Sequence, residues 1–345
     1  MKILDFRSDT ITKPSQAMRA VMAAAEVGDD VYGEDPTINK LEELAASMTG
    51  FEAALFATSG TQGNLLALLS HCRPGDEAIV EEESHIFVNE VGGMAALVGI
   101  LAKTLRGPLA AQGALDPAAV ESAIRADNIH YPVTTLVCLE NTHNKGGGAA
   151  STPAQMQAVA KVAHAHGMHI HLDGARAFNA AEAQQITIKT LLVDMDSAQL
   201  CLSKGLGAPV GSVLVGERAF IKRARKWRKM IGGGMRQAGV IAAAGLYALQ
   251  NNIPQLNVDH ANAALLADAL DEVKGLQVVR PDIMTNLVVV NTGASGKKGT
   301  EWVAVLAEKG IKIGANGTYS IRFATHLDIS KADVLEAIER IHTIK

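Results

Sequence analysis

Cysteine and aromatic residues are scarce in this chain of 345 residues, which holds three cysteines and 4% aromatic residues. Cys72, Cys138 and Cys201 lie too far apart in the sequence to form a metal-binding motif or a disulfide framework. Their isolation favours a reducing compartment, and a cytoplasmic location is expected. The chain also lacks an apolar run of about 18 residues, so no membrane span is predicted. Its first residues lack the apolar core of a signal peptide.

An excess of positive charge is absent as well, because the formal net charge is −4. The sequence therefore predicts no nucleic-acid partner and no binding to an anionic membrane surface. Residues 218–229 are locally basic and are interpreted as a solvated helix face or a subunit contact. The composition, with 48% hydrophobic and 20% charged residues, is typical of a globular protein. The length allows one large domain or two of ordinary size.

The main candidate for a catalytic residue is Lys204, with Ser203 and Gly205 beside it. It stands between two predicted buried strands, residues 197–202 and 211–215. An amine at a strand end, against a glycine-rich turn, can be partly dehydrated, as a Schiff-base lysine requires. The alternative is a solvated turn lysine, the usual state of this side chain.

A loop rich in small residues follows the predicted buried strand at 53–57 and precedes a predicted helix that runs to His71. Ser59, Gly60 and Thr61 lie in this loop, where free amides and the helix dipole would attract an anion such as phosphate. The alternative is that the hydroxyls only cap the helix. Neither of the common glycine-rich nucleotide-binding motifs is present, so a nucleotide ligand is not favoured.

Further polar side chains follow other predicted strands. His85 comes after a strand at 77–80 and before a predicted helix at 90–99, where a structural histidine is the alternative. Asp173 ends a strand at 169–173 and is followed by Arg176. Strands and helices that alternate over residues 53–215 predict a mostly parallel sheet covered on both faces. Parallel sheets bind ligands at the carboxyl ends of their strands, where these residues lie.

The last part of the chain has a different pattern, with short strands interleaved with helices after residue 276. It predicts a smaller α+β domain, in which Arg322 stands in the middle of a strand at 320–324 and faces either solvent or a cleft between domains. We therefore expect an N-terminal arm (1–14), a large domain (15–250) and a small C-terminal domain (251–345).

These parts together match the needs of pyridoxal phosphate. This cofactor requires an anchor for its phosphate, a partner that stacks on its ring, an acid opposite its pyridine nitrogen and an amine that forms an imine. The loop at 59–61, His85, Asp173 and Lys204 supply one of each. The carboxylate keeps the ring nitrogen protonated, which lets the ring accept electrons.

Several motifs in the same order resemble the low-specificity L-threonine aldolases, which are fold-type I pyridoxal phosphate enzymes near the β-eliminating lyases. The motifs are Phe6-Arg-Ser-Asp-Thr, Val27-Gly-Asp-Asp-Val-Tyr-Gly-Glu-Asp-Pro, Ser59-Gly-Thr, Glu140-Asn-Thr-His-Asn, His171-Leu-Asp-Gly-Ala-Arg, Cys201-Leu-Ser-Lys-Gly-Leu-Gly-Ala-Pro-Val-Gly, Gly232-Gly-Gly-Met-Arg-Gln and Ile321-Arg-Phe-Ala-Thr-His-Leu. The resemblance implies an aspartate aminotransferase-like large domain with a mostly parallel sheet, and a smaller α+β domain. Two departures, the residues before Thr325 and the glycines at 146–148, remove no site group.

The resemblance also implies a role for each site residue and a homotetramer with active sites at subunit interfaces. Lys204 would carry the cofactor, Asp173 would bind its pyridine nitrogen and His85 would lie over its ring. The remaining implied roles are phosphate binding by Ser59, Gly60 and Thr61, a contact of Arg176 with the cofactor's phenolic oxygen, substrate carboxylate binding by Ser8 and Arg322, and contacts of Arg236 and Tyr32 with a neighbouring subunit's phosphate and substrate pocket.

The implied reaction is the cleavage of L-threonine to glycine and acetaldehyde. His85 and His130 are the candidates for the base that takes the β-hydroxyl proton, with His130 preferred and His85 assigned chiefly to stacking. The alternatives are β-elimination or transamination with the same cofactor, and a non-catalytic scaffold. A metal-dependent aldolase is disfavoured, because a helix end and the alternating faces of a strand are expected to separate the histidines at 164, 166, 169 and 171.

Overall fold

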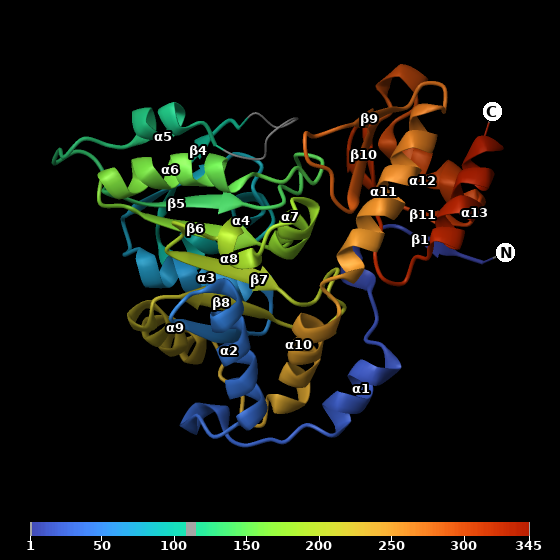
Figure 1. Ribbon diagram of the computed structural model, residues 1–345. Helices are drawn as coiled ribbons and strands as arrows, with labels where there is room; N and C mark the ends of the chain where they lie inside the picture. The colour runs from blue at the N-terminus through green and yellow to red at the C-terminus, as the bar shows by residue number, and fades with distance from the viewer. Residues whose placement is uncertain (1, 108–114, 345) are drawn as a thin grey trace.

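The computed structural model describes residues 2–107 and 115–344, which form two larger sheets and a two-stranded one, with helices around them (Figure 1). The central sheet has seven strands in the order β2-β8-β7-β6-β5-β3-β4. All of its neighbouring strands are parallel except at β8, which runs antiparallel to both β2 and β7. The predicted α/β fold with a mostly parallel sheet is confirmed. Its strands are β2 (Ala53–Ala57), β3 (Glu77–Glu81), β4 (Leu101–Leu105), β5 (Thr134–Glu140), β6 (His169–Gly174), β7 (Ser197–Cys201) and β8 (Ser212–Gly216).

Helices cover the central sheet, whose inner strands are buried and largely apolar, as parallel strands require. Two helices, α3 (Gly60–His71) and α9 (Arg218–Met230), pack together against strands β2, β6, β7 and β8. A second group, with α2 on β2 and β8 and α6 on β5 and β6, packs with the remaining helices of this part of the chain. The bounds are α1 (Gln16–Ala23), α2 (Pro36–Thr49), α4 (His85–Val88), α5 (Pro117–Ala123), α6 (Pro153–Ala165), α7 (Ala177–Ala183), α8 (Ile188–Leu191) and α10 (Gly239–Asn251).

The C-terminal part forms a separate antiparallel sheet in the order β12-β13-β10-β9. The start of the chain joins it, because β1 (Leu4–Asp5) pairs with β11 (Ile311–Lys312), and Leu4 and Phe6 are buried in the core of this part. Figure 1 shows both termini beside this sheet. The boundaries at residues 14 and 250 stay a prediction. The other elements are α11 (Gln255–Asp271), α12 (Gly299–Glu308), α13 (Lys331–His342), β9 (Gln277–Val279), β10 (Leu287–Asn291), β12 (Gly314–Gly317) and β13 (Ser320–Ala324).

One expected helix is wrong. Residues 90–99 do not form a continuous helix, because Val91 and Gly92 have φ angles of 56° and 68°, in the left-handed region. A short π-helical turn, Met94–Val98, is all that remains there, and Glu90 is free to turn inward. The edge strand β4 that follows was not predicted. Its exposed and half-buried residues lack the apolar run that marks the inner strands.

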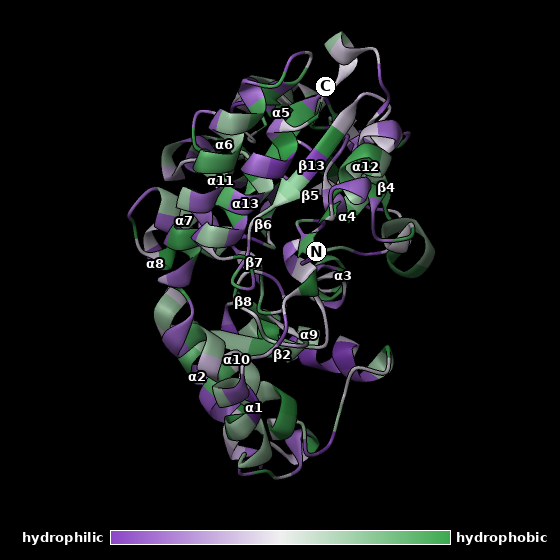
Figure 2. Cartoon of the chain, turned by 90° about the vertical axis from the view of Figure 1, so that its right-hand side faces the viewer, coloured by the Kyte–Doolittle hydropathy of each residue, from purple (hydrophilic) through white to green (hydrophobic). Residues whose placement is uncertain are grey.

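Most helices carry hydrophilic and hydrophobic residues side by side along their length, as Figure 2 shows. This mixture is typical of helices that bury one face and expose the other. Within residues 2–107 and 115–344, no helix combines the length and the apolar character needed to cross a bilayer.

Candidate active site

A cavity of ≈ 290 Å³ lies against the carboxyl end of β6 and the amino end of α3. Five residues singled out from the sequence line it, so segments more than 140 residues apart in the chain meet here. The lining residues are Thr10, Gly60, Thr61, Asn64, His85, Glu90, Asp173, Ala175, Gln199, Cys201, Ser203, Lys204 and Pro209.

Lys204 stands in the loop between β7 and β8 and is half-buried. Its backbone carbonyl accepts hydrogen bonds from the Thr12 hydroxyl and the Gly207 amide, both at 2.9 Å. The loop closes through Gly211, where φ is +105° and a Cβ would lie 2.5 Å from the Phe56 ring, so only glycine fits. Among the described residues, the Lys204 ammonium has no hydrogen-bond partner. The backbone is therefore fixed while the amine is left available.

The amino end of α3 forms the opposite wall. Ser59 is the N-cap, and its Oγ accepts from the Gln62 amide at 3.1 Å. The amides of Gly60 and Thr61 find no acceptor within the described part of the chain, as expected for the first turn of a helix. Ser59 therefore caps the helix, and anion binding by the free amides stays a prediction.

Asp173 is fully buried, yet its carboxylate has three donors. Oδ1 accepts from the Ala175 amide at 3.1 Å, and Oδ2 accepts from Asn64 Nδ2 at 2.9 Å. With its amide nitrogen facing Asp173, Gln199 donates to Oδ1 at 3.2 Å and accepts from Cys201 N and Ser212 Oγ. Donors on several sides fix the orientation of the carboxylate. Neither Asn64 nor Gln199 was singled out from the sequence.

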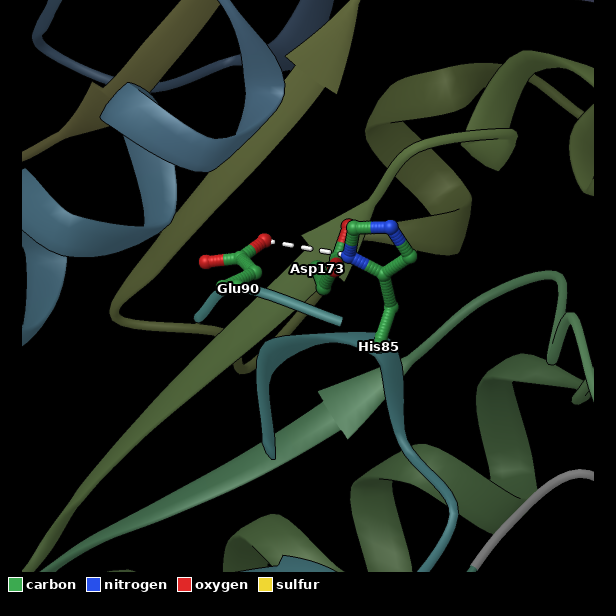
Figure 3. A group of neighbouring side chains, drawn as sticks. All are labelled: His85, Glu90 and Asp173. Atoms are coloured by element: carbon green, nitrogen blue, oxygen red, sulfur yellow. Dashed lines mark hydrogen bonds and ion pairs between the residues drawn. The ribbon is translucent and has the colours of Figure 1, made fainter. Parts of the chain in front are cut away.

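His85 lies next to Asp173 and Glu90 in Figure 3, and its Nδ1 is 3.1 Å from Glu90 Oε1. This hydrogen bond raises the pKa of His85. The backbone at His85 is held by Glu140, whose two oxygens accept from the amides of His85, at 2.6 Å, and Asn144, at 2.8 Å. Sequence reasoning missed the roles of Glu90 and Glu140, because the contacts of Glu90 with Asn64 and of Glu140 with His85 join residues 26 and 55 positions apart.

The same three side chains in Figure 3 also offer metal-ligand atoms within 4.8 Å of one another, the only such group found among the described residues. His85 already bonds to Glu90, and Asn64 Nδ2 donates to both Glu90 Oε1 and Asp173 Oδ2, each at 2.9 Å. The cluster therefore belongs to the wall of the cavity that contains Lys204.

Two arginines lie beside Asp9, and only one of them pairs with its carboxylate. Arg176 donates from Nε and Nη2 to both oxygens of Asp9, at 2.6 and 2.7 Å, and both side chains are buried. Arg322 reaches from β13 to Asn144 Oδ1, at 2.7 Å, while its buried Nε has no partner. Burial and the charge of Arg176 lower the pKa of Arg322. Arg176 and Arg322 carry two positive charges beside the single negative charge of Asp9, so a second carboxylate would balance the charge here. Arg322 thus faces the large domain rather than open solvent.

The other predicted site residues are placed differently. Ser8 precedes Asp9, the partner of Arg176, and caps a short helical turn, accepting from the Thr10 amide at 3.2 Å. Tyr32 is 76% exposed, and Arg236 pairs with Asp29 at 3.1 Å. His130 is exposed and precedes the amino end of β5, whereas the cavity lies at the carboxyl end of β6. This chain by itself does not bring Tyr32, His130 or Arg236 to the cavity.

The expected separation of the four histidines is wrong in one respect. His164 and His169 both approach Asp196 Oδ2, at 3.0 and 3.7 Å. They meet because Asp196 leads into β7, the neighbour of β6, and also accepts from the Ile170 amide. His171 points elsewhere, into the interior of the protein.

Comparison with known proteins assigns the family. Residues 5–292 match the family model described as beta-eliminating lyase. The chain is 46% identical to the low specificity L-threonine aldolase of Escherichia coli K12 over 336 residues, which covers 97% of both chains. It is 44% identical to low-specificity L-threonine aldolase 1 of Arabidopsis thaliana, with 97% of this chain and 94% of the relative covered.

Solved structures agree on the fold. A threonine aldolase from Leishmania major superposes with a TM-score of 0.83 at 22% identity, covering 98% of both chains. A serine palmitoyltransferase from Sphingomonas wittichii gives 0.79 at 16% identity, covering 99% of this chain and 86% of that one. With the arrangement of Lys204, Asp173 and the first turn of α3, these matches establish that the chain belongs to the beta-eliminating lyase family and, within it, to the low-specificity L-threonine aldolases.

Proposed function

We propose that the protein cleaves L-threonine, L-allo-threonine and other β-hydroxy-α-amino acids to glycine and an aldehyde, with pyridoxal 5′-phosphate as cofactor. The observation that carries this proposal is the meeting of Lys204, Asp173 and the free amides of α3 in one cavity. Bound pyridoxal phosphate supplies an electron sink for the pair released when the Cα–Cβ bond opens. The 42–46% identity to low-specificity L-threonine aldolases of Arabidopsis thaliana and Escherichia coli supports the same conclusion.

The donors of the cavity fit the cofactor group by group. Ser59 and the amides of Gly60 and Thr61 suit the phosphate, because they combine free N–H groups with the positive end of a helix dipole. Asp173 suits the pyridine nitrogen, the flat ring of His85 suits stacking, and the free amine of Lys204 suits the aldehyde. Arg176 suits the phenolic oxygen, with its charge held in place by Asp9.

Arg322 and Ser8 are the proposed anchors of the substrate carboxylate. The unpartnered Nε and the charged fork of Arg322 can bind it in a bidentate manner. Asn144 holds the guanidinium from the other side and so limits its rotation. A fixed carboxylate sets the direction of the Cα–Cβ bond, and this alignment contributes to the rate by positioning.

The base that accepts the β-hydroxyl proton is assigned to His130 rather than to His85. The hydrogen bond to Glu90 raises the pKa of His85 and so favours its protonated form, which cannot accept a proton. His130, Tyr32 and Arg236 lie away from the cavity of their own chain, so their assigned roles require a neighbouring chain. A homotetramer with shared sites is therefore part of the proposal, as is a cytoplasmic location, in keeping with three buried free cysteines.

The proposed reaction is tested with the purified protein, added pyridoxal phosphate and L-threonine or L-allo-threonine. We expect glycine and acetaldehyde in equal amounts, together with visible absorption of the bound cofactor. Ammonia with a keto acid would instead indicate β-elimination, and transfer of the amino group to an added keto acid would indicate transamination. A protein that binds no cofactor would contradict the whole assignment.

Replacing Arg322 with leucine is expected to lower kcat/KM for L-threonine by about 100-fold, chiefly through KM, since a bidentate pair of charge-assisted hydrogen bonds is worth about 3 kcal/mol. Arg322→Lys keeps the charge without the fork and is expected to fall between the two. Steady-state kinetics with each variant measure the effect. Arg280→Leu, an exposed arginine paired with Asp268 and Asp271, is the control. An unchanged KM in Arg322→Leu would contradict the role.

A further inference from the structure

A line of buried polar groups begins at Asp173 and leads away from the cavity. Asn64, on the second turn of α3, donates from Nδ2 to Asp173 and to Glu90, both at 2.9 Å. Because its nitrogen faces two carboxylates, its Oδ1 must be the atom that faces His171 Nε2 at 3.1 Å. An amide oxygen only accepts, so the His171 proton is on Nε2.

The next links follow from that proton. His171 is fully buried in β6, and burial lowers its pKa to about 4, so the ring is neutral and carries one proton. Its Nδ1 must then accept, and the Ser197 hydroxyl at 2.9 Å is the donor. His171 and Ser197 face each other because they are register partners in the β6–β7 pair.

The line ends at His71. With its only proton given to His171, the Ser197 oxygen accepts from His71 Nε2 at 2.8 Å. His71 Nδ1 has no partner within the described part of the chain, and the ring is wedged against Phe220 and His169, with centroids 4.4 and 4.7 Å away. Burial lowers the pKa of His71 well below its ordinary value, so this ring is neutral as well.

Every donor in the series therefore points toward Asp173. Helix geometry makes the arrangement possible, because Asn64 and His71 are seven residues apart, two turns along one face of α3, and bracket His171 and Ser197. A series of bonds with one direction strengthens each member by polarisation, and its last donor acts on the carboxylate.

We propose that Asn64, His171, Ser197 and His71 are positioning residues that act through one another on Asp173, holding its carboxylate in place and aimed at the pyridine nitrogen of the cofactor. The inference rests on the proposed function only in its assumption that Asp173 faces that nitrogen. His171, Ser197 and His71 do not line the cavity, so they touch neither cofactor nor substrate.

The test compares His171→Phe, which removes both links, with His171→Gln, whose amide can donate to Asn64 and accept from Ser197. The cofactor dissociation constant is expected to rise on the order of tenfold in His171→Phe, because the hydrogen bond from His171 to Asn64, the residue that holds Asp173, is lost. In His171→Gln the dissociation constant is expected to recover. With ring-labelled pyridoxal phosphate, the ¹⁵N chemical shift of the pyridine nitrogen should move toward the unprotonated value in His171→Phe only. The value of kcat should fall in His171→Phe, whereas KM for threonine should stay unchanged because Arg322 is not altered.

If His171→Phe fails to fold, Ser197→Ala tests whether these residues act on Asp173. It breaks the line two links from Asp173 and should shift the ¹⁵N signal in the same direction by a smaller amount. Ser70→Ala is its matched control, because Ser70 is the buried neighbour of His71 and its hydroxyl has no partner. If the unmodified protein binds the cofactor and makes glycine while His171→Phe or Ser197→Ala shows the unchanged ¹⁵N shift and dissociation constant, the inference is overturned and the function stands. If the unmodified protein binds no cofactor, the proposed function itself fails.

Discussion

Replacing Lys204 with alanine is expected to reduce the cleavage of L-threonine on the order of 1,000-fold or more, because the amine that attacks the cofactor's aldehyde is lost. The loop should keep its shape, since the hydrogen bonds of residue 204 to Thr12 and Gly207 use its backbone carbonyl. The assay is the formation of glycine and acetaldehyde by the variant and the unmodified protein at saturating cofactor.

A chemical measurement accompanies the kinetics. Borohydride reduction of the loaded protein, followed by peptide mass analysis, should attach the cofactor to the peptide that contains Lys204 and to none in Lys204→Ala. Lys161→Ala, on the exposed side of α6, is the control and should behave as the unmodified protein. Attachment to another lysine would remove the basis of the proposed function.

Replacing Asp9 with asparagine is expected to destabilise the protein by about 3–5 kcal/mol, because it leaves the guanidinium of Arg176 buried without a charged partner. The loss extends to the junction of the two sheets, since Asn286, from the loop before β10, also donates to Asp9 at 3.1 Å. Thermal unfolding of the cofactor-free variant and the unmodified protein measures the difference.

Two variants serve as controls for Asp9→Asn. Asp5→Asn breaks an exposed pair with Arg7 and should cost at most about 1 kcal/mol. The double variant Asp9→Asn with Arg176→Met removes the unpaired charge and should recover part of the stability without recovering activity.

The effect of Asp9 should also depend on pH. Although burial opposes ionisation, Arg176 holds the pKa of Asp9 well below its usual range. The contribution of Asp9 to stability is therefore present above pH ~4 and is lost as pH falls below that value. The difference in the free energy of unfolding between Asp9→Asn and the unmodified protein should therefore become smaller in acid. A difference that does not change with pH would argue against the ion pair.

Local patterns in the sequence were enough to predict the inner strands of the central sheet and the residues at their ends. Buried strands of a parallel sheet are short apolar runs, and their carboxyl ends meet at one edge whatever the order of the strands. This is why His85, Asp173 and Lys204 could be proposed together from a list of strand ends, and why they line one cavity. The failed helix at 90–99 shows the limit of the method, because backbone angles at Val91 and Gly92 decided that segment.

What the sequence by itself determined is the set of chemical groups: an amine, a carboxylate, an imidazole and a helix start, each next to a predicted strand. Only the tertiary structure decided how these groups are held. Asn64 meets Asp173, His171 meets Ser197 and Arg176 meets Asp9 through the register of β6 with β7 and the packing of α3 and the N-terminal segment. Such contacts join residues 26 to 167 positions apart, and no pattern of neighbouring residues encodes them, because hydrogen bonding depends on distance in space and not along the chain.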